Sequence, residues 1–272
     1  MTDSYAVVGN PVAHSKSPWI HARFAALTGQ AMTYAAIDAP LAGFAATVDA
    51  FRAGGGRGVN VTAPFKLDAC AYADALSDRA RRAGAVNALK FTLEGARGEN
   101  FDGVGLVRDV VHNIGEPIAG RRVLILGAGG AARGIVEPIL AEGPSVLRIA
   151  NRTADKARDL ARLFESLGPV VGGGYADAGG AFDMVINATS ASWGDSAPPA
   201  PASAYAGTAL AYELAYGKSL TRFMAAARAG GARRLADGAG MLVEQAAEAF
   251  AWWRGVRPPT EAVLAGLTVP LV

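Results

Sequence analysis

Short apolar runs alternate along this chain with longer stretches in which apolar residues recur every three or four positions. The short runs are typical of strands, and the longer stretches are typical of amphipathic helices. In the N-terminal part, the pattern predicts strands over residues 5–8, 32–37, 58–61 and 85–92. It predicts helices over residues 18–27, 44–52, 66–72 and 78–82. Ser17 and Pro18 suit the N-cap and the first position of the first helix.

The same alternation continues to the end of the chain. A connecting helix over residues 103–113, with Asp102 at its N-cap, is followed by strands over 123–126, 146–150, 184–187, 209–214 and 234–236. Further helices are predicted over residues 131–141, 154–167, 241–254 and 260–267, and a Pro-rich loop over 197–202. Alternating strands and helices favour parallel sheets. We therefore predict an α/β fold with two domains flanking a cleft, the C-terminal one a Rossmann-type, doubly wound parallel sheet.

Composition narrows the class of protein. Hydrophobic residues make up 51% of the 272 residues and charged residues 18%, which is typical of a folded chain with a substantial core. No apolar run approaches the roughly 20 residues of a membrane-spanning helix, and the N-terminus lacks a signal-peptide pattern. The net charge of +2 is small and the 26 basic residues are dispersed, which does not favour nucleic-acid binding. We expect a cytoplasmic protein that binds a small molecule as a monomer or homodimer.

Cysteine and histidine usage limits the chemistry further. Cys70 is the only cysteine, which excludes intrachain disulfides and thiolate-cluster metal sites. His14, His21 and His112 lack the spacing of metal ligands. No metal is therefore expected.

A glycine turn follows the strand predicted at residues 123–126. Gly127 and Gly129 match the first two glycines of the dinucleotide fingerprint, and Ala132 takes the place of the third. Gly127 would form a tight turn, Gly129 would let the backbone approach a pyrophosphate, and the following helix would offer free N–H groups to phosphate. In a chain with 34 glycines, an ordinary strand–helix turn is the alternative.

The end of the next predicted strand favours NADP(H) over NAD(H). NAD-binding units usually carry an acidic residue here for the ribose hydroxyls, but this chain has Asn151, Arg152 and Thr153, with Lys156 one turn later. Arg152 and Lys156 would attract a 2′-phosphate, which a carboxylate would repel, and Thr153 could donate a hydroxyl. Thr153 could also simply cap the following helix, and both roles can hold together.

Four polar clusters punctuated by Gly and Pro lie near strand ends in the first domain. They are His14-Ser-Lys-Ser-Pro18, Asn60-Val-Thr-Ala-Pro-Phe-Lys66, Ala85-Val-Asn87 and Gly98-Glu-Asn-Phe-Asp-Gly-Val-Gly105. They are followed in order by Gly127-Ala-Gly-Gly-Ala131, Asn151-Arg-Thr153, Asn187-Ala-Thr-Ser190 and Gly240-Met-Leu-Val-Glu-Gln245. In this combination, which extends over nearly the whole chain, the sequence resembles the shikimate dehydrogenase family.

The resemblance implies an NADP-dependent oxidoreductase that reversibly reduces 3-dehydroshikimate to shikimate with NADPH, in the shikimate pathway of aromatic amino-acid biosynthesis. It implies a substrate-binding and catalytic domain over residues 1–101 and 239–272, and an NADP-binding domain over 102–238. Lys66 and Asp102 would form the catalytic pair. The implied substrate-binding residues are Ser15, Ser17, Asn60, Thr62, Lys66, Asn87, Asp102, Tyr216 and Gln245. The implied cofactor-binding residues are Gly127, Ala128, Gly129, Gly130, Ala131, Asn151, Arg152, Thr153, Lys156, Thr189, Leu214, Gly238 and Met241.

The chemistry of a ketone reduction agrees with this pair, because the reaction needs a hydride donor and a proton donor at the developing alkoxide. A lysine beside a carboxylate can supply that proton, or it can mainly stabilise the alkoxide as a fixed charge. The sequence leaves both roles open for Lys66. Lys66 could also be a solvated residue in a first helical turn, and Asp102 could serve only as an N-cap.

Other candidate residues also have plainer interpretations. Asn60 and Asn87 could fix turns, and Tyr216 could be a buried aromatic residue at a strand end. Gln245 could be a surface residue, but it lies four positions after Met241 on the same helix face. That face could offer an apolar group to a nicotinamide and an amide to the substrate.

The chain departs from the usual family pattern at a few positions. Phe101 stands where Thr is common, Ala88 where Thr commonly follows Asn87, Ser192 where Gly is usual and Glu213 where Asp is usual. Phe101 could reshape the cleft wall and Ser192 could stiffen the cofactor loop. None of these departures removes a proposed catalytic group.

Two alternatives to a strict shikimate dehydrogenase remain open at this point. One is a dehydrogenase of the same fold with broader use of quinate or NAD⁺. The other is a non-catalytic ligand sensor, which the retention of both Lys66 and Asp102 disfavours.

Overall fold

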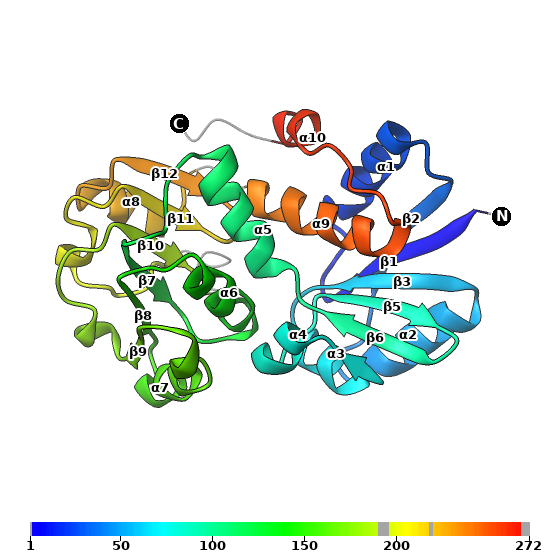
Figure 1. Cartoon of the computed structure of the whole chain (residues 1–272), viewed down its shortest axis with the longest axis horizontal. Coiled ribbons are helices and arrows are strands. Elements are labelled where there is room, and N and C mark those ends of the chain that lie inside the picture. Colours follow the sequence, from blue (N-terminus) through cyan, green and yellow to red (C-terminus); the bar gives the residue numbers. More distant parts are fainter. Residues whose placement is uncertain (1, 190–195, 218–219, 268–272) are drawn as a thin grey trace. The chain divides into compact units, whose positions relative to one another are not determined.

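The computed structural model describes residues 2–189, 196–217 and 220–267, and the chain forms two compact units (Figure 1). The first unit comprises Met1–Gly105 and Leu242–Gly266, and the second comprises Leu106–Met241 and Leu267–Val272. Each unit is built on one sheet, which has six strands in the described part of the chain. Among the described residues, none of the helices combines the length and the apolar character needed to cross a membrane.

The first unit contains a mixed sheet. Its strands are β1 (Asp3–Gly9), β2 (Met32–Asp38), β3 (Gly56–Val61), β4 (Ala75–Leu76), β5 (Ala88–Thr92) and β6 (Gly95–Glu99), in the order β2-β1-β3-β5-β6-β4. Strand β1 pairs in parallel with β2 and β3, whereas β5 pairs antiparallel with both β3 and β6. The expectation of a parallel sheet is wrong for this part of the unit.

The difference arises from a tight hairpin between β5 and β6. Thr92 pairs with Gly95, which has a φ of +129°, so only two residues separate the strands and β6 must return antiparallel. Strand β5 also begins at Ala88, three residues later than predicted, because Val86 donates its N–H to the Lys66 carbonyl instead of to a strand partner (2.9 Å).

Helices cover both faces of the first sheet. They are α1 (Ser17–Thr28), α2 (Phe44–Ala53), α3 (Lys66–Tyr72), α4 (Asp78–Ala83), α10 (Glu261–Ala265) and the part of α9 (Ala239–Arg254) that belongs to this unit. Side chains alternate between the faces, so Ala6 and Val8 of β1 pack with Phe44 of α2, while Tyr5 of β1 stacks on Trp253 of α9.

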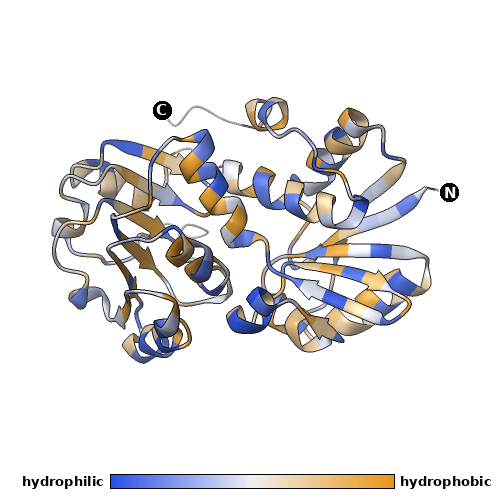
Figure 2. Ribbon diagram, in the orientation of Figure 1, coloured by the Kyte–Doolittle hydropathy of each residue, from blue (hydrophilic) through white to orange (hydrophobic). Residues whose placement is uncertain are grey.

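The second unit confirms the predicted Rossmann-type, doubly wound parallel sheet. Its strands are β7 (Arg122–Leu126), β8 (Val146–Ala150), β9 (Val170–Gly173), β10 (Met184–Asn187), β11 (Leu210–Glu213) and β12 (Arg234–Asp237), all parallel in the order β12-β11-β10-β7-β8-β9. Strands β7 and β10 are hydrophobic along most of their length (Figure 2), as expected for strands buried on both faces.

One face of this sheet packs against α6 (Gly130–Ala141), α7 (Ala154–Arg162) and the π-helical turn η1 (Asp109–Asn113). The other packs against α8 (Arg222–Ala229) and the 3₁₀ turn η5 (Ala202–Tyr205). Two helices are shorter than predicted. Residues 103–113 divide into α5 (Asp102–Arg108) and η1, and residues 154–167 divide into α7 and the 3₁₀ turn η2 (Glu165–Leu167).

The helix starts differ from the predicted caps. Ser17 lies inside α1, and the Ser15 hydroxyl accepts the Ser17 N–H at 3.2 Å. Asp102 is the first residue of α5, not its cap, and it donates its own N–H to Asn100 Oδ1 at 3.1 Å. Thr153 does occupy the N-cap position of α7, but its side chain makes no capping hydrogen bond. Capping therefore does not account for these three residue types.

Candidate active site

One edge of the first sheet gathers most of the predicted substrate-binding residues. Strands β1, β3 and β6 run in the same direction and β5 runs in the opposite direction. Their carboxyl ends and the amino end of β5 therefore lie at the same edge. Ser15 and Ser17 follow β1, Thr62 follows β3, Asn87 precedes β5 and Asp102 follows β6.

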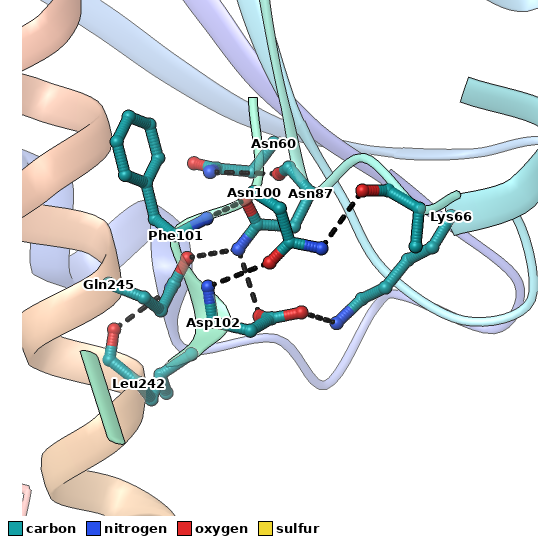
Figure 3. A network of polar contacts seen from close by, with 9 residues as sticks. Asn60, Lys66, Asn87, Asn100, Phe101, Asp102, Leu242 and Gln245 are labelled. Atoms are coloured by element: carbon teal, nitrogen blue, oxygen red, sulfur yellow. Dashed lines mark hydrogen bonds and ion pairs between the residues drawn. The ribbon is translucent and has the colours of Figure 1, made fainter. Parts of the chain in front are cut away.

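A buried carboxylate lies at the centre of this edge. Lys66 Nζ donates to Asp102 Oδ2 at 2.5 Å, and Asn87 Nδ2 donates to Asp102 Oδ1 at 2.9 Å (Figure 3). The Asp102 side chain is 6% exposed, whereas the Lys66 side chain is 17% exposed. The ammonium group is thus held by a nearly buried partner and still reaches the protein surface. This arrangement excludes the interpretation of Lys66 as a fully solvated lysine.

Two further amides extend the network. Gln245 of α9 accepts from Asn87 Nδ2 at 3.2 Å and donates to the Leu242 carbonyl at 2.9 Å. Asn60 of β3 donates from Nδ2 to the Asn87 carbonyl at 3.3 Å. Gln245 is 8% exposed and Asn60 is 5% exposed, so Gln245 is not an ordinary surface residue. Figure 3 shows these side chains converging from a strand, a loop and a helix.

Two residues next to Asp102 were not predicted as site residues. Asn100 is fully buried, donates to the Ala85 carbonyl at 2.9 Å and orients the start of α5 through its bond to the Asp102 N–H. An Asn two positions before a helix is a recognisable signal for this role. Phe101 contributes its backbone N–H, which donates to Asn87 Oδ1 at 2.8 Å.

The Phe101 ring does not point into this network. It packs beside Trp252 of α9, with ring centroids 5.8 Å apart, and under the guanidinium of Arg79. Figure 3 shows the ring directed away from Lys66 and Asp102. The ring thus contacts Trp252 and Arg79, and the expected effect of Phe101 on the cleft wall stays a prediction.

The remaining substrate-binding candidates divide between the two units. Ser17 is buried, while Ser15 and Thr62 are partly exposed at the same sheet edge. Tyr216 belongs to the second unit, where it follows β11 and is partly buried. Chemically, the first-unit set combines one cation, one carboxylate, amides and hydroxyls, which suits a small ligand rich in hydroxyl and carboxylate groups.

In the second unit, the predicted cofactor-binding residues lie at the carboxyl ends of neighbouring parallel strands. Gly127 follows β7, Asn151 follows β8, Thr189 lies beyond β10, Leu214 follows β11 and Gly238 follows β12. Open α/β sheets bind ligands at this edge.

The glycine turn has the geometry that its sequence predicts. Gly127 has a φ of +110°, and a Cβ there would lie 3.1 Å from the Ala188 backbone. Gly129 is the N-cap of α6, and a Cβ on it would meet no described atom within 4 Å. Packing therefore does not demand glycine at 129, whereas close approach of a ligand would. Gly130 and Ala131 open the helix, and N–H groups of a first helical turn lack intrahelical acceptors. The turn fits a pyrophosphate.

The predicted 2′-phosphate residues form an exposed turn. Asn151 donates from Nδ2 to the Thr153 carbonyl at 3.0 Å, which shapes the connection from β8 to α7. Arg152, Thr153 and Lys156 are exposed. Two cations and a hydroxyl are thus presented to solvent next to the strand ends.

The other predicted cofactor-binding residues are held in place by close packing or by hydrogen bonds. A Cβ on Gly238 would lie 2.2 Å from the Leu214 carbonyl oxygen, so only glycine allows this approach. Thr189 donates from both its N–H and its hydroxyl to Asn187 Oδ1, at 3.1 and 2.7 Å. Met241 donates its N–H to the buried Tyr212 hydroxyl at 3.3 Å. Ser190 and Ser192 lie outside the described residues.

Comparisons with known proteins bear on this arrangement. Residues 7–89 match the shikimate dehydrogenase substrate binding domain, residues 109–193 match shikimate/quinate 5-dehydrogenase, and residues 238–265 match the shikimate 5′-dehydrogenase C-terminal domain. The shikimate dehydrogenase (NADP(+)) of Nitrosospira multiformis is 57% identical over 97% of this chain and 96% of its own. This chain belongs to the shikimate dehydrogenase family.

Solved structures agree with this assignment to the shikimate dehydrogenase family. An Ael1 enzyme from Pseudomonas putida is 54% identical, with a TM-score of 0.94 over 100% of both chains. The shikimate 5-dehydrogenase of Thermus thermophilus, solved in complex with NADP(H) and shikimate, is 32% identical, with a TM-score of 0.86 over 98% of both chains.

Proposed function

We propose that this protein is an NADP-dependent shikimate dehydrogenase, which reversibly reduces 3-dehydroshikimate to shikimate with NADPH. The observation that carries the proposal is the Lys66–Asp102 pair, held at 2.5 Å inside a network of amides. The relative at 57% identity is named for this activity with NADP(+). The reaction belongs to the shikimate pathway of aromatic amino-acid biosynthesis.

The first unit binds the substrate and the second binds the cofactor. Bound NADPH supplies a hydride to the substrate carbonyl carbon. Lys66 Nζ gives a proton to the carbonyl oxygen and regains one in the reverse direction. Asp102 accepts one hydrogen bond from Nζ and keeps it in place. The positive charge of the ammonium also stabilises negative charge on the substrate carbonyl oxygen.

The other assigned side chains bind and orient. Ser15 and Ser17 hold the substrate carboxylate. The remaining residues of the substrate-binding set hold the ring hydroxyls or line the ring, and they are Asn60, Thr62, Asn87, Tyr216 and Gln245. In the second unit, the glycine turn holds the pyrophosphate through backbone N–H groups, as helix N-termini do for phosphates.

Specificity for NADP(H) rests on the exposed turn after β8. Arg152 and Lys156 attract the 2′-phosphate, and Thr153 offers it a hydroxyl. Met241 would offer an apolar group to the nicotinamide, and Thr189, Leu214 and Gly238 would belong to the residues that hold the cofactor. We further propose a cytoplasmic location, no nucleic-acid partner, and a monomer or homodimer.

A direct assay tests the proposal. Purified protein is incubated with shikimate and NADP⁺, and NADPH formation is followed by absorbance from neutral to alkaline pH, with quinate and NAD⁺ as alternative substrates. Turnover of shikimate with NADP⁺ is expected to exceed the other combinations. Comparable turnover of quinate would support the broader dehydrogenase instead, and binding of shikimate with no turnover at any pH would support a ligand sensor.

A further inference from the structure

Tyr34 of β2 makes a hydrogen bond that lies next to the site. Its hydroxyl donates to Asn60 Oδ1 at 2.7 Å. In the sheet register, Tyr34 pairs with Tyr5, and Tyr5 pairs with Gly58. Asn60 is two residues beyond Gly58 and therefore lies on the same face of β3. The tyrosine reaches diagonally across β1 to the asparagine.

This bond determines which way the Asn60 amide is turned. An amide oxygen accepts hydrogen bonds and an amide nitrogen donates two. Because Tyr34 donates to Oδ1, Nδ2 is directed to the other side, where it donates to the Asn87 carbonyl at 3.3 Å. One N–H of Asn60 is used in this way, and the second has a fixed direction. Without the tyrosine proton, the longer bond to the Asn87 carbonyl would hold the amide in this orientation less firmly.

The environment of Tyr34 keeps it a donor. Burial raises the pKa of the Tyr34 hydroxyl well above its usual value, while a hydrogen bond from the Ser17 hydroxyl acts in the opposite direction. The phenol is therefore protonated at neutral pH. The His21 ring stacks on it with centroids 4.1 Å apart and planes 5° apart, which limits its rotation. Ser17, Tyr34 and Asn60 thus form one connected set.

We propose that Tyr34 is a positioning residue for substrate binding, which acts through Asn60 by fixing the orientation of its amide. The inference rests on the proposed function, because Asn60 and Ser17 are assigned there to the substrate. Tyr34 itself belongs to none of the motifs from which the substrate residues were assigned.

The test compares two tyrosines of the same aromatic cluster. Tyr34→Phe keeps the ring and its stacking but removes the hydroxyl. The control is Tyr5→Phe, since Tyr5 also packs in this cluster and its hydroxyl accepts from Arg254 instead of contacting Asn60 (3.4 Å). Wild type and both variants are assayed for kcat and for KM with shikimate and NADP⁺, and thermal unfolding is measured on each.

Tyr34→Phe is expected to raise the KM for shikimate about tenfold, with kcat changed less than about threefold and the KM for NADP⁺ unchanged. Tyr5→Phe is expected to leave both KM values unchanged. In an Asn60→Ala background, Tyr34→Phe should have no further effect on the shikimate KM, because the group through which it acts is gone.

Each other outcome overturns the inference. If Tyr34→Phe and Tyr5→Phe have the same KM for shikimate in an active enzyme, Tyr34 has no positioning role. If Tyr34→Phe raises this KM equally in the Asn60→Ala background, Tyr34 does not act through Asn60. A variant that fails to unfold cooperatively would show that the hydroxyl is needed for folding. Wild-type protein inactive on shikimate would refute the proposed function first, and this inference with it.

Discussion

Each unit contains a buried carboxylate that holds an asparagine side chain, and the two carboxylates differ in their other partners. In the first unit, Asp102 accepts from Asn87 Nδ2 at 2.9 Å and from the Lys66 ammonium at 2.5 Å. In the second unit, Glu213 accepts from Asn187 Nδ2 at 2.9 and 3.2 Å. It also accepts from the Thr221 hydroxyl and from a backbone N–H, both at 3.2 Å.

Under the proposed function, this difference separates a reactive carboxylate site from a structural one. A buried carboxylate needs several donors to offset its desolvation, and both sites provide them. In the first unit, one donor is an ammonium whose side chain remains 17% exposed, so a proton and a positive charge are presented to a ligand. In the second unit, Glu213 is fully buried. Its donors include Asn187 at the end of β10 and Thr221 at the start of α8.

The largest expected effect comes from removing the ammonium. Lys66→Ala should lower kcat by about 10²–10⁴-fold and change the KM for shikimate much less, because proton transfer is lost while the hydroxyl-binding amides remain. Steady-state kinetics with shikimate and NADP⁺ measure both constants. Lys90→Ala is the control, since Lys90 donates to the Trp252 carbonyl at 2.8 Å and lies outside the network. A near-normal kcat in Lys66→Ala would contradict the catalytic role of the Lys66 ammonium.

Matched carboxylate-to-amide substitutions test the two carboxylates directly. Asp102→Asn should lower kcat about a hundredfold and the free energy of unfolding by about 1–3 kcal/mol, because the new N–H₂ group faces the Asn87 and Lys66 donors. Glu213→Gln should lower the free energy of unfolding by about 1–3 kcal/mol, because a new N–H₂ group faces buried donors. Its kcat should stay within about threefold of wild type. Urea unfolding and steady-state kinetics are measured on both variants. A larger loss of kcat in Glu213→Gln than in Asp102→Asn would reverse the assignment of the two carboxylates.

In the second unit, Arg152 is predicted to bind the 2′-phosphate of the cofactor. Arg152→Ala should raise the KM for NADP⁺ about tenfold and leave the KM for NAD⁺ nearly unchanged, since only NADP⁺ carries the 2′-phosphate. The control is Arg158→Ala on the helix that follows, α7, where the exposed Arg158 pairs with Asp155 at 2.8 Å. Equal changes for both cofactors would mean that Arg152 does not contact the 2′-phosphate.

The last prediction concerns acid stability and involves the first unit. Burial lowers the pKa of His21 from 6.5 to about 3, against an opposing effect of the nearby Asn60. Between pH 6.5 and about 3, the unfolded chain therefore binds the proton that the folded chain does not, and stability falls as the pH falls. The contribution is about 1.4 kcal/mol per pH unit.

His21→Phe keeps an aromatic ring in the stack and removes this titration. Urea unfolding at pH 7, 6 and 5 should show that the variant loses less stability toward acid than wild type does. Parallel pH profiles for the two proteins would contradict the assignment of the low pKa to His21.

Local motifs predicted much of the site and of the second sheet. The Gly127 turn and the Asn151–Thr153 segment are each short stretches of sequence, so their geometry depends on neighbouring residues. The apolar runs predicted five of the six described strands of the second sheet, and β9 was missed. Strand β6 was missed because Gly95–Glu99 contains two glycines and two charged residues, and its pairing comes from β5. No alternation of apolar residues marks such a strand.

Contacts between distant residues were the least predictable. The Lys66–Asp102 pair was predicted from the family resemblance, but the Asn100 side chain that accepts the Asp102 N–H was not. The bond from Tyr34 of β2 to Asn60 of β3 joins residues 26 positions apart. Nothing in the sequence of β2 marks Tyr34 as a partner of the site. The roles of the site residues toward substrate and cofactor stay predictions, which the variants above test.

Two of the three points at which the chain changes units lie inside helices. The boundary between Gly105 and Leu106 falls inside α5, and the boundary between Met241 and Leu242 falls inside α9. A fragment cut at either position would begin or end in the middle of a helix, with severed backbone hydrogen bonds. The units are therefore not interchangeable modules, and a chimaera that replaces the nucleotide-binding unit would have to join its parts outside both helices.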